Sequence, residues 1–120
     1  MSDAILEYSL TEVAAGIRRK EFSSEEVTRT SLEKIEKLQS KLNCFISIYA
    51  EEAIDAAKRA DKAMASGDEI GSLHGVPLAH KDMFYRDGFV STGGSKIQKT
   101  FKPSYTATVL DKLDAAGAIH

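Results

Sequence analysis

One lysine is the first candidate for chemistry in this chain. Lys81 lies in the segment GVPLAHKDMF, which begins at Gly75, and the glycine-rich segment STGGS follows at Ser91. A neutral lysine can take a proton from a hydroxyl group, and burial favours the neutral form because it disfavours the charged one. A lysine at a strand end can equally lay its alkyl stem on apolar surface while its ammonium group reaches water. The residues alone favour this second, purely structural interpretation.

The element expected to position this lysine is a short, largely buried strand. Residues 76–84 are mostly apolar, and glycines flank them on both sides. Alternation along a strand would place Ala79, Lys81 and Met83 on one face and Asp82 on the other. Lys81 is therefore expected among apolar side chains, and Asp82 is not automatically its ion-pair partner. The following residues 92–95 could bring backbone amides near a substrate, although adjacent glycines more often form a turn.

Several segments resemble the amino-terminal part of the amidase signature family. They are GVPLAHKDMF, STGGS and TATVLDKLDAAGAIH, together with the preceding LEKIEKLQSKLNCFISI and AIDAAKRADKAMASG, so the resemblance covers nearly the whole chain. The lysine–aspartate pair carries most of its specificity. The resemblance implies an enzyme that hydrolyses carboxamide C–N bonds with a Ser–cis-Ser–Lys triad, in which Lys81 matches the lysine.

The same resemblance implies that part of the triad is absent from these residues. The family's two catalytic serines lie in a serine- and glycine-rich segment downstream of the helix that ends near Gly117. Ser91 and Ser95 precede that helix and correspond to neither serine, so Lys81 is the single catalytic residue assigned. The chain is thus expected to be an amino-terminal fragment of one amidase domain, inactive alone, with a helical part at residues 1–43 and the start of an α/β core at 44–120.

Two alternatives to an amide hydrolase remain open. The A subunit of a glutamyl-tRNA amidotransferase uses the same chemistry to release ammonia from glutamine for its partner subunits. Such subunits usually have a small aliphatic residue before the lysine and asparagine after the aspartate, whereas this chain has His80 and Met83 there. The second alternative is a short, non-catalytic interaction module, which the absence of the serines permits.

Composition and net charge limit the classes of partner that this chain is expected to bind. A chain of 120 residues with 42% hydrophobic and 28% charged residues is expected to form one folded domain. Its net charge of −2 argues against strong electrostatic binding to nucleic acid or to an anionic membrane. A small-molecule amide, bound by the complete protein, is the expected partner.

No cofactor or metal is expected. His74, His80 and His120 stand at no recognised ligand spacing, and the glycines match no phosphate-cradle motif. Cys44 is the single cysteine and is interpreted as a packing residue. The absence of a signal-peptide pattern at the start predicts a cytoplasmic protein.

The remaining pattern predicts an α/β fold. Capping boxes at Ser9 and Ser23 predict two helices. The second carries an apolar stripe that could pack inside the fold or form a homodimer, made of Val27, Leu32, Ile35, Leu38 and Leu42. A strand is expected at residues 44–49, a helix at 50–66, a helix starting at Ser104 or Thr106 and ending at Ala116, and a further strand from Ala118. Together these give amino-terminal helices plus the first strands of a mixed sheet covered by helices, a truncated amidase signature fold.

Overall fold

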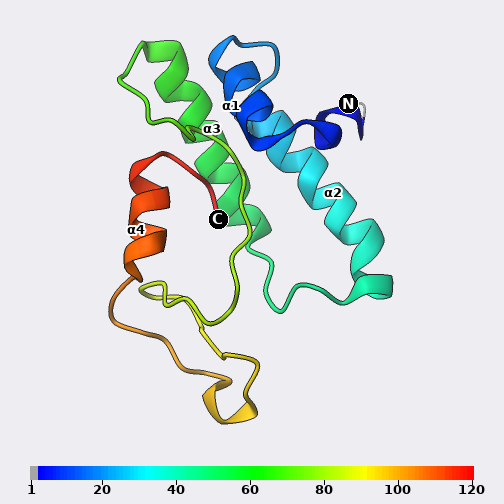
Figure 1. Ribbon diagram of the computed structural model, residues 1–120, viewed down its shortest axis with the longest axis vertical. Coiled ribbons are helices and arrows are strands. Elements are labelled where there is room, and N and C mark those ends of the chain that lie inside the picture. Colours follow the sequence, from blue (N-terminus) through cyan, green and yellow to red (C-terminus); the bar gives the residue numbers. More distant parts are fainter. Residues whose placement is uncertain (1–2) are drawn as a thin grey trace.

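The computed structural model describes residues 3–120, so the expected domain of residues 1–120 can be followed from its third residue onward. The element order, shown in Figure 1, is η1 (Asp3–Glu7), α1 (Leu10–Arg18), α2 (Ser24–Leu42), α3 (Ala50–Ser66), η2 (Lys96–Gln98) and α4 (Thr108–Ala115). No helix within this described part is long and apolar enough to cross a membrane.

The two predicted capping boxes are confirmed. The Glu12 carboxylate accepts a 2.7 Å hydrogen bond from the Ser9 amide, and the Glu26 carboxylate accepts one of 2.7 Å from the Ser23 amide. Each box satisfies donors that a helix start would leave unpaired, and losing such a cap costs about 1 kcal/mol. The two helices that follow contribute to a core that also includes η1 and the lysine segment, made of Ile5, Val13, Ala14, Ile17, Val27 and Val76.

Helices α2 and α3 are tied together at the start of α2. The Asp61 carboxylate on α3 accepts hydrogen bonds from the amides of Ser24 (2.7 Å) and Glu25 (3.0 Å). The Ser24 hydroxyl, which is fully buried, donates a 2.5 Å bond to the carbonyl of Gly75. Gly75 has φ of +74°, and a Cβ there would lie 2.7 Å from Ser24 Oγ, so only glycine fits. This contact anchors the segment that leads to Lys81.

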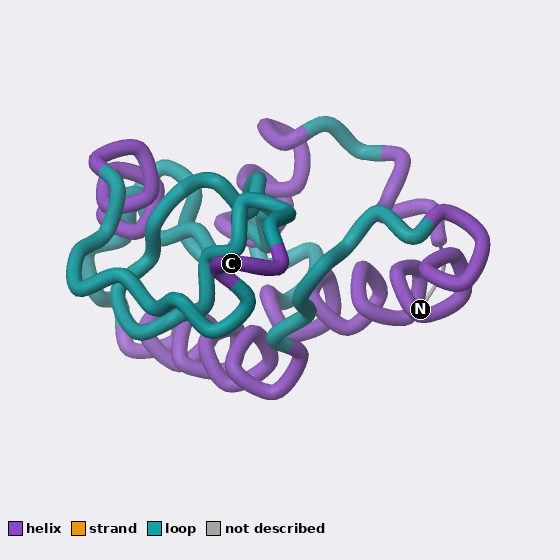
Figure 2. Tube along the Cα trace, turned by 90° about the horizontal axis from the view of Figure 1, so that it is seen from below, coloured by secondary structure: helices purple, strands orange, loops and turns teal. Residues whose placement is uncertain are grey.

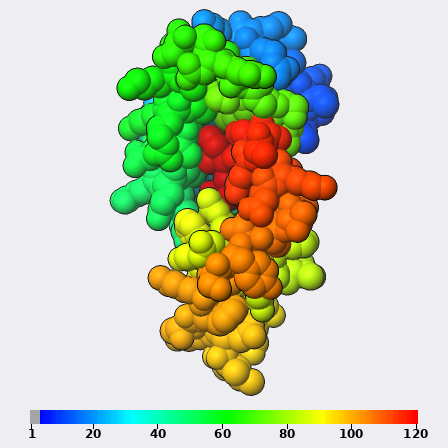
Figure 3. Space-filling view, turned by 90° about the vertical axis from the view of Figure 1, so that its left-hand side faces the viewer, coloured from blue at the N-terminus to red at the C-terminus, as the bar shows by residue number. Residues whose placement is uncertain are grey.

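The prediction of a mixed sheet is wrong. Across residues 3–120 the backbone forms one isolated parallel bridge, between Pro77 and Ile119, and no strand ladder. The Leu78 amide donates to the Ile119 carbonyl (2.6 Å), and the Ile119 amide donates to the Val76 carbonyl (2.8 Å). The strands expected at residues 76–84 and from Ala118 therefore pair only over this short stretch. In Figure 3 the red residues at this end of the chain lie between green α3 and orange α4.

The strand expected at residues 44–49 is also absent, because no described segment pairs with it. Instead, Gln39 Nε2 donates to the Phe45 carbonyl (2.7 Å) and the Phe45 amide donates to Gln39 Oε1 (3.2 Å). Buried or half-buried backbone groups need partners, and here one side chain of α2 supplies them. An apolar, β-prone sequence thus stays a loop when no neighbouring strand is available.

A long loop connects the lysine segment to α4 and makes up the lower end of the molecule in Figure 1. Figure 2 is viewed from this end and draws the segment mostly in the teal of loops and turns. It folds back on itself through hydrogen bonds from the Ser91 amide to the Phe101 carbonyl (3.0 Å) and from the Ala107 amide to the Tyr85 carbonyl (2.8 Å). The Tyr85 ring contacts the rings of Phe101 and Tyr105, each at a centroid distance of 5.4 Å. These contacts give shape to a segment with little helix of its own.

Candidate functional site

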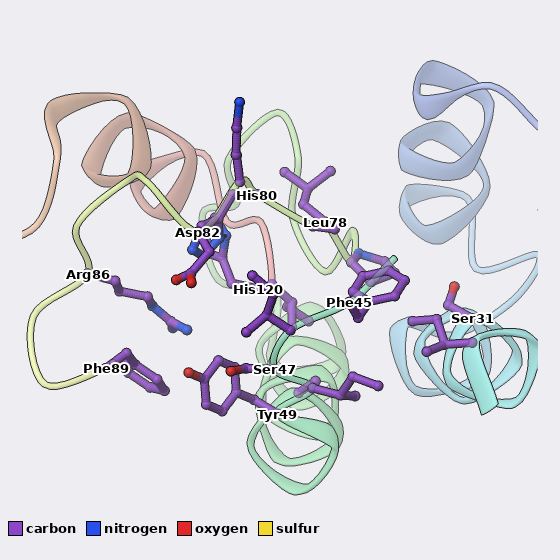
Figure 4. A pocket seen from close by; sticks show the side chains of 18 of the residues that line it. Ser31, Phe45, Ser47, Tyr49, Leu78, His80, Asp82, Arg86, Phe89 and His120 are labelled. Carbon is purple, nitrogen blue, oxygen red and sulfur yellow. Dashed lines mark hydrogen bonds between the residues drawn. The ribbon is translucent and has the colours of Figure 1, made fainter. Parts of the chain in front are cut away.

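Lys81 lies at the edge of a cavity of about 530 Å³. Apolar side chains from α2, from the loop before α3 and from α3 form one part of the wall, including Leu32, Ile35, Phe45, Ile46, Ile48 and Ala53, and the lysine segment, the long loop after it and the chain end form the rest. Figure 4 shows Asp82 and Arg86 on one side of this cavity and Phe45 on the other. The arrangement is an apolar hollow with charged groups along one rim.

The surroundings of Lys81 differ from those expected. The backbone turns at this residue, with the Phe84 amide donating to the Lys81 carbonyl (3.1 Å), so the strand alternation ends before it. Lys81 is exposed, and its expected apolar neighbour Met83 is 55% exposed. Its backbone is fixed while its side chain is accessible. The assignment of Lys81 as a catalytic base stays a prediction.

The next residue, Asp82, joins the lysine segment to the glycine-rich segment. Its carboxylate accepts hydrogen bonds from the Thr92 amide (3.1 and 3.2 Å to the two oxygens) and from the Thr92 hydroxyl. Its backbone carbonyl accepts from the Gly93 amide (2.9 Å) and from the Ser91 hydroxyl (3.2 Å). The side-chain carboxylate and the backbone carbonyl of Asp82 therefore both bond to the same turn.

The amides of this turn bond to the protein itself. Beyond the two amides that Asp82 engages, the Gly94 amide donates to Thr92 Oγ1 (3.0 Å) and the Ser95 amide donates to the Thr92 carbonyl (2.9 Å). Gly93 and Gly94 have φ of +57° and +74°, a region that favours glycine, although a Cβ at either would meet nothing closer than 3.9 Å. The turn interpretation of these glycines is thus favoured over the hypothesis that their amides contact a substrate.

Two histidines whose contact was not predicted from the sequence lie together near Lys81. His80 Nδ1 and His120 Nδ1 are 3.2 Å apart, and His120 Nε2 lies 3.0 Å from Asp114 Oδ1. Burial lowers the pKa of His80, and a positive charge on His120 would lower it further. Burial also lowers the pKa of His120, whose side chain is 2% exposed, although the nearby Asp114 carboxylate opposes this. Recognising the parallel pairing of the two chain segments would have found this contact.

The other candidates from the sequence lie elsewhere. His74 Nε2 is 2.8 Å from the Ala60 carbonyl, away from the two paired histidines. Within residues 3–120, no three His, Cys, Asp or Glu side chains gather closely enough to hold a metal ion. Cys44, interpreted as a packing residue, is exposed and lies beside the cavity, so that interpretation is wrong.

A cluster of an arginine and two aromatic side chains at the cavity rim was also not predicted from the sequence. The Arg86 guanidinium lies 4.1 Å from the centre of the Phe89 ring, and Phe89 meets Tyr49 edge to face at 4.8 Å between centroids. A cation over an aromatic face at this distance is attractive. The contact joins the long loop to the segment before α3, and the spacing of these residues in the sequence gives no sign of it.

Comparisons with known proteins identify relatives over nearly the whole chain. The family model described as Amidase matches residues 26–120. The A subunit of the glutamyl-tRNA(Gln) amidotransferase from Ectopseudomonas mendocina strain ymp is 46% identical over 111 residues, which cover 92% of this chain and 23% of that protein. The chain thus spans about a quarter of the length of the curated relatives it matches.

Solved structures agree in fold. The peptide amidase from Stenotrophomonas maltophilia superposes with a TM-score of 0.89 at 26% identity, covering 98% of this chain and 24% of that one. Fatty acid amide hydrolase superposes with a TM-score of 0.90 at 26% identity, covering 97% of this chain and 21% of that one. The arrangement of helices and loops described above therefore recurs within much longer chains.

Proposed function

This chain belongs to the amidase family, and from that premise we propose that it is the amino-terminal part of an enzyme that hydrolyses a carboxamide C–N bond. The observation that carries the proposal is the family match over residues 26–120, which includes the Lys81–Asp82 pair. Residues 1–120 would form part of a single amidase domain. The substrate would be a small amide bound by the complete protein.

In the proposed mechanism neutral Lys81 is the base of a Ser–cis-Ser–Lys triad whose serines come from the rest of the complete protein. The nucleophilic serine attacks the amide carbonyl carbon, and its hydroxyl proton passes through the cis-serine to the Lys81 amine. The C–N bond then breaks, the proton returns to the departing nitrogen, and an acyl ester remains on the serine. Water attacks this ester and releases the acid.

The surroundings of Lys81 support this role in one respect. A base must be placed to within a fraction of an ångström and must also be reachable by its partner groups. Hydrogen bonds hold the backbone on both sides of Lys81, and its side chain remains exposed at the cavity edge. The same placement leaves room for serines from a following segment to approach.

A second candidate is the A subunit of a glutamyl-tRNA amidotransferase. The 46% identity to a protein of that kind favours it, compared with 26% to the peptide amidase and to fatty acid amide hydrolase. His80 and Met83 argue the other way, because they differ from the residues usual at these positions in such proteins. In this case the amide would be glutamine, and the ammonia would pass to partner subunits.

The test is amide turnover by the complete protein that carries this chain. Ammonia release from glutamine and from simple amides is measured for the wild type, Lys81→Ala and Lys81→Arg, after circular dichroism has confirmed that each variant folds. Both substitutions should abolish turnover. Lys81→Ala removes the base, and Lys81→Arg replaces it with a guanidinium group, which stays protonated and cannot act as a base. Near-normal turnover of Lys81→Arg would overturn the proposal. A complete reading frame without a serine-rich continuation would favour the interaction module.

A further inference from the structure

We propose that Asp82 is a positioning residue that fixes Lys81 by binding the turn at residues 91–94. This inference rests on the proposed function of Lys81. Asp82 contacts the turn through two separate groups, its carboxylate on Thr92 and its carbonyl on Ser91 and Gly93. Bonds to a carboxylate are charge-assisted and roughly twice as strong as bonds between neutral groups.

The carboxylate of Asp82 serves this turn rather than a cation. None of the ion pairs in residues 3–120 includes Asp82 or Lys81; they join Arg19 to Glu21, Arg29 to Glu25 and His120 to Asp114. Thr92 offers it both an amide and a hydroxyl, and that hydroxyl in turn accepts from Gly94. Asp82 is only partly exposed, so these bonds are partly protected from water. The geometry therefore assigns the carboxylate to holding the turn.

Holding the turn fixes Lys81 because of where it lies along the chain. Before the lysine, the backbone is held by the pairing of Leu78 with Ile119. At the lysine itself, the Phe84 amide bonds to the Lys81 carbonyl within a local turn. The first residue after it that is bonded to a separate segment is Asp82, whose Cα lies one peptide, about 3.8 Å, from that of Lys81. Without the carboxylate bonds to Thr92, the backbone after Lys81 would be held only by the Asp82 carbonyl and by the local turn, so the lysine would be positioned less firmly. A displacement of about 1 Å in a catalytic group can cost about 100-fold in rate.

The experiment measures acyl-enzyme formation by the complete protein in single turnover. Asp82→Asn keeps the size of the side chain but removes its charge, and Thr92→Val removes the hydroxyl partner at nearly constant shape. Thr92→Ser restores the hydroxyl, and Ser95→Ala, in the same segment but without a bond to Asp82, is the matched control. Lys81→Ala in the same assay shows whether the lysine itself is required.

The expected result is a loss of acylation rate with the active fraction kept. In Asp82→Asn and Thr92→Val the rate constant should fall about 10- to 100-fold with little change in KM, while Thr92→Ser and Ser95→Ala stay near wild type. The amplitude of the single turnover should remain close to one per site. Hydrogen exchange should show faster exchange of the Thr92 and Gly93 amides in Asp82→Asn.

Three results would overturn the inference. An unchanged rate constant in Asp82→Asn would show that Lys81 needs no such support. A lower amplitude with an unchanged rate constant would show that Asp82 merely stabilises the fold. A loss in Asp82→Asn with a normal rate in Thr92→Val would show that Asp82 acts without the turn. If the wild type lacks turnover, or Lys81→Ala keeps it, the proposed function itself fails and the inference falls with it.

Discussion

Replacing Gly75 with alanine tests whether the contact between α2 and the lysine segment is as tight as described. Alanine at φ +74° costs about 1–2 kcal/mol in the backbone alone. Its Cβ would also lie 2.7 Å from Ser24 Oγ and 2.8 Å from Ser24 Cβ, distances that force a shift. Weakening the buried hydrogen bond from Ser24 to the Gly75 carbonyl and crowding this site add about 1–3 kcal/mol.

Gly67→Ala is the matched control for this substitution. Gly67 ends α3 with φ of +76°, but a Cβ there would meet no atom within 4 Å, so only the backbone cost of about 1–2 kcal/mol applies. Urea unfolding of both variants, followed by helical circular dichroism, should show Gly75→Ala less stable than Gly67→Ala by about 1–3 kcal/mol. Equal losses would refute the close contact with Ser24.

Three other outcomes are expected. The free energy of unfolding should fall as the pH drops below about 6.5, because burial lowers the pKa values of His80 and His120 and folding therefore favours their neutral forms. Acid titrations of His80→Gln should show a smaller loss of stability than those of the wild type. The 120-residue chain alone should release no ammonia above the blank, because a base without the two serines of its triad has nothing to activate. The same chain should bind an apolar dye and self-associate in light scattering, because Leu42 and Ile46 are 61% and 66% exposed; a monodisperse, dye-free monomer would contradict this.

The helices could be predicted because their signals are local. Ser23 and Glu26 stand three residues apart, so both ends of the capping contact belong to one short stretch of sequence. Gly67 ends α3 at the residue expected, since a left-handed backbone there needs only glycine itself. The apolar stripe of α2 was predicted from the same local periodicity, but within it only Val27 is buried, and Leu42 at its end is 61% exposed.

The strands could not be predicted in the same way, because a strand depends on a partner elsewhere. Residues 44–49 have the composition of a strand, yet within the described chain their backbone partner is the side chain of Gln39. The Pro77–Ile119 bridge joins positions far apart in the sequence, and the contact of His80 with His120 follows from it. The contacts of Asp82 were hidden for the same reason, since its partners lie on a turn about ten residues further along the chain.

The position of Lys81 depends on contacts with three separate parts of the chain. Ser24 on α2 holds Gly75, Ile119 pairs beside Pro77, and Thr92 binds Asp82, so the fixed points lie on both sides of the lysine. The side chain itself remains exposed at the cavity rim. Such a lysine can be displaced by substitutions that never touch it. In the proposed enzyme, substitutions at Ser24 and at Thr92 should therefore lower the rate constant similarly but differ in their effect on the free energy of unfolding, because only Ser24 is fully buried.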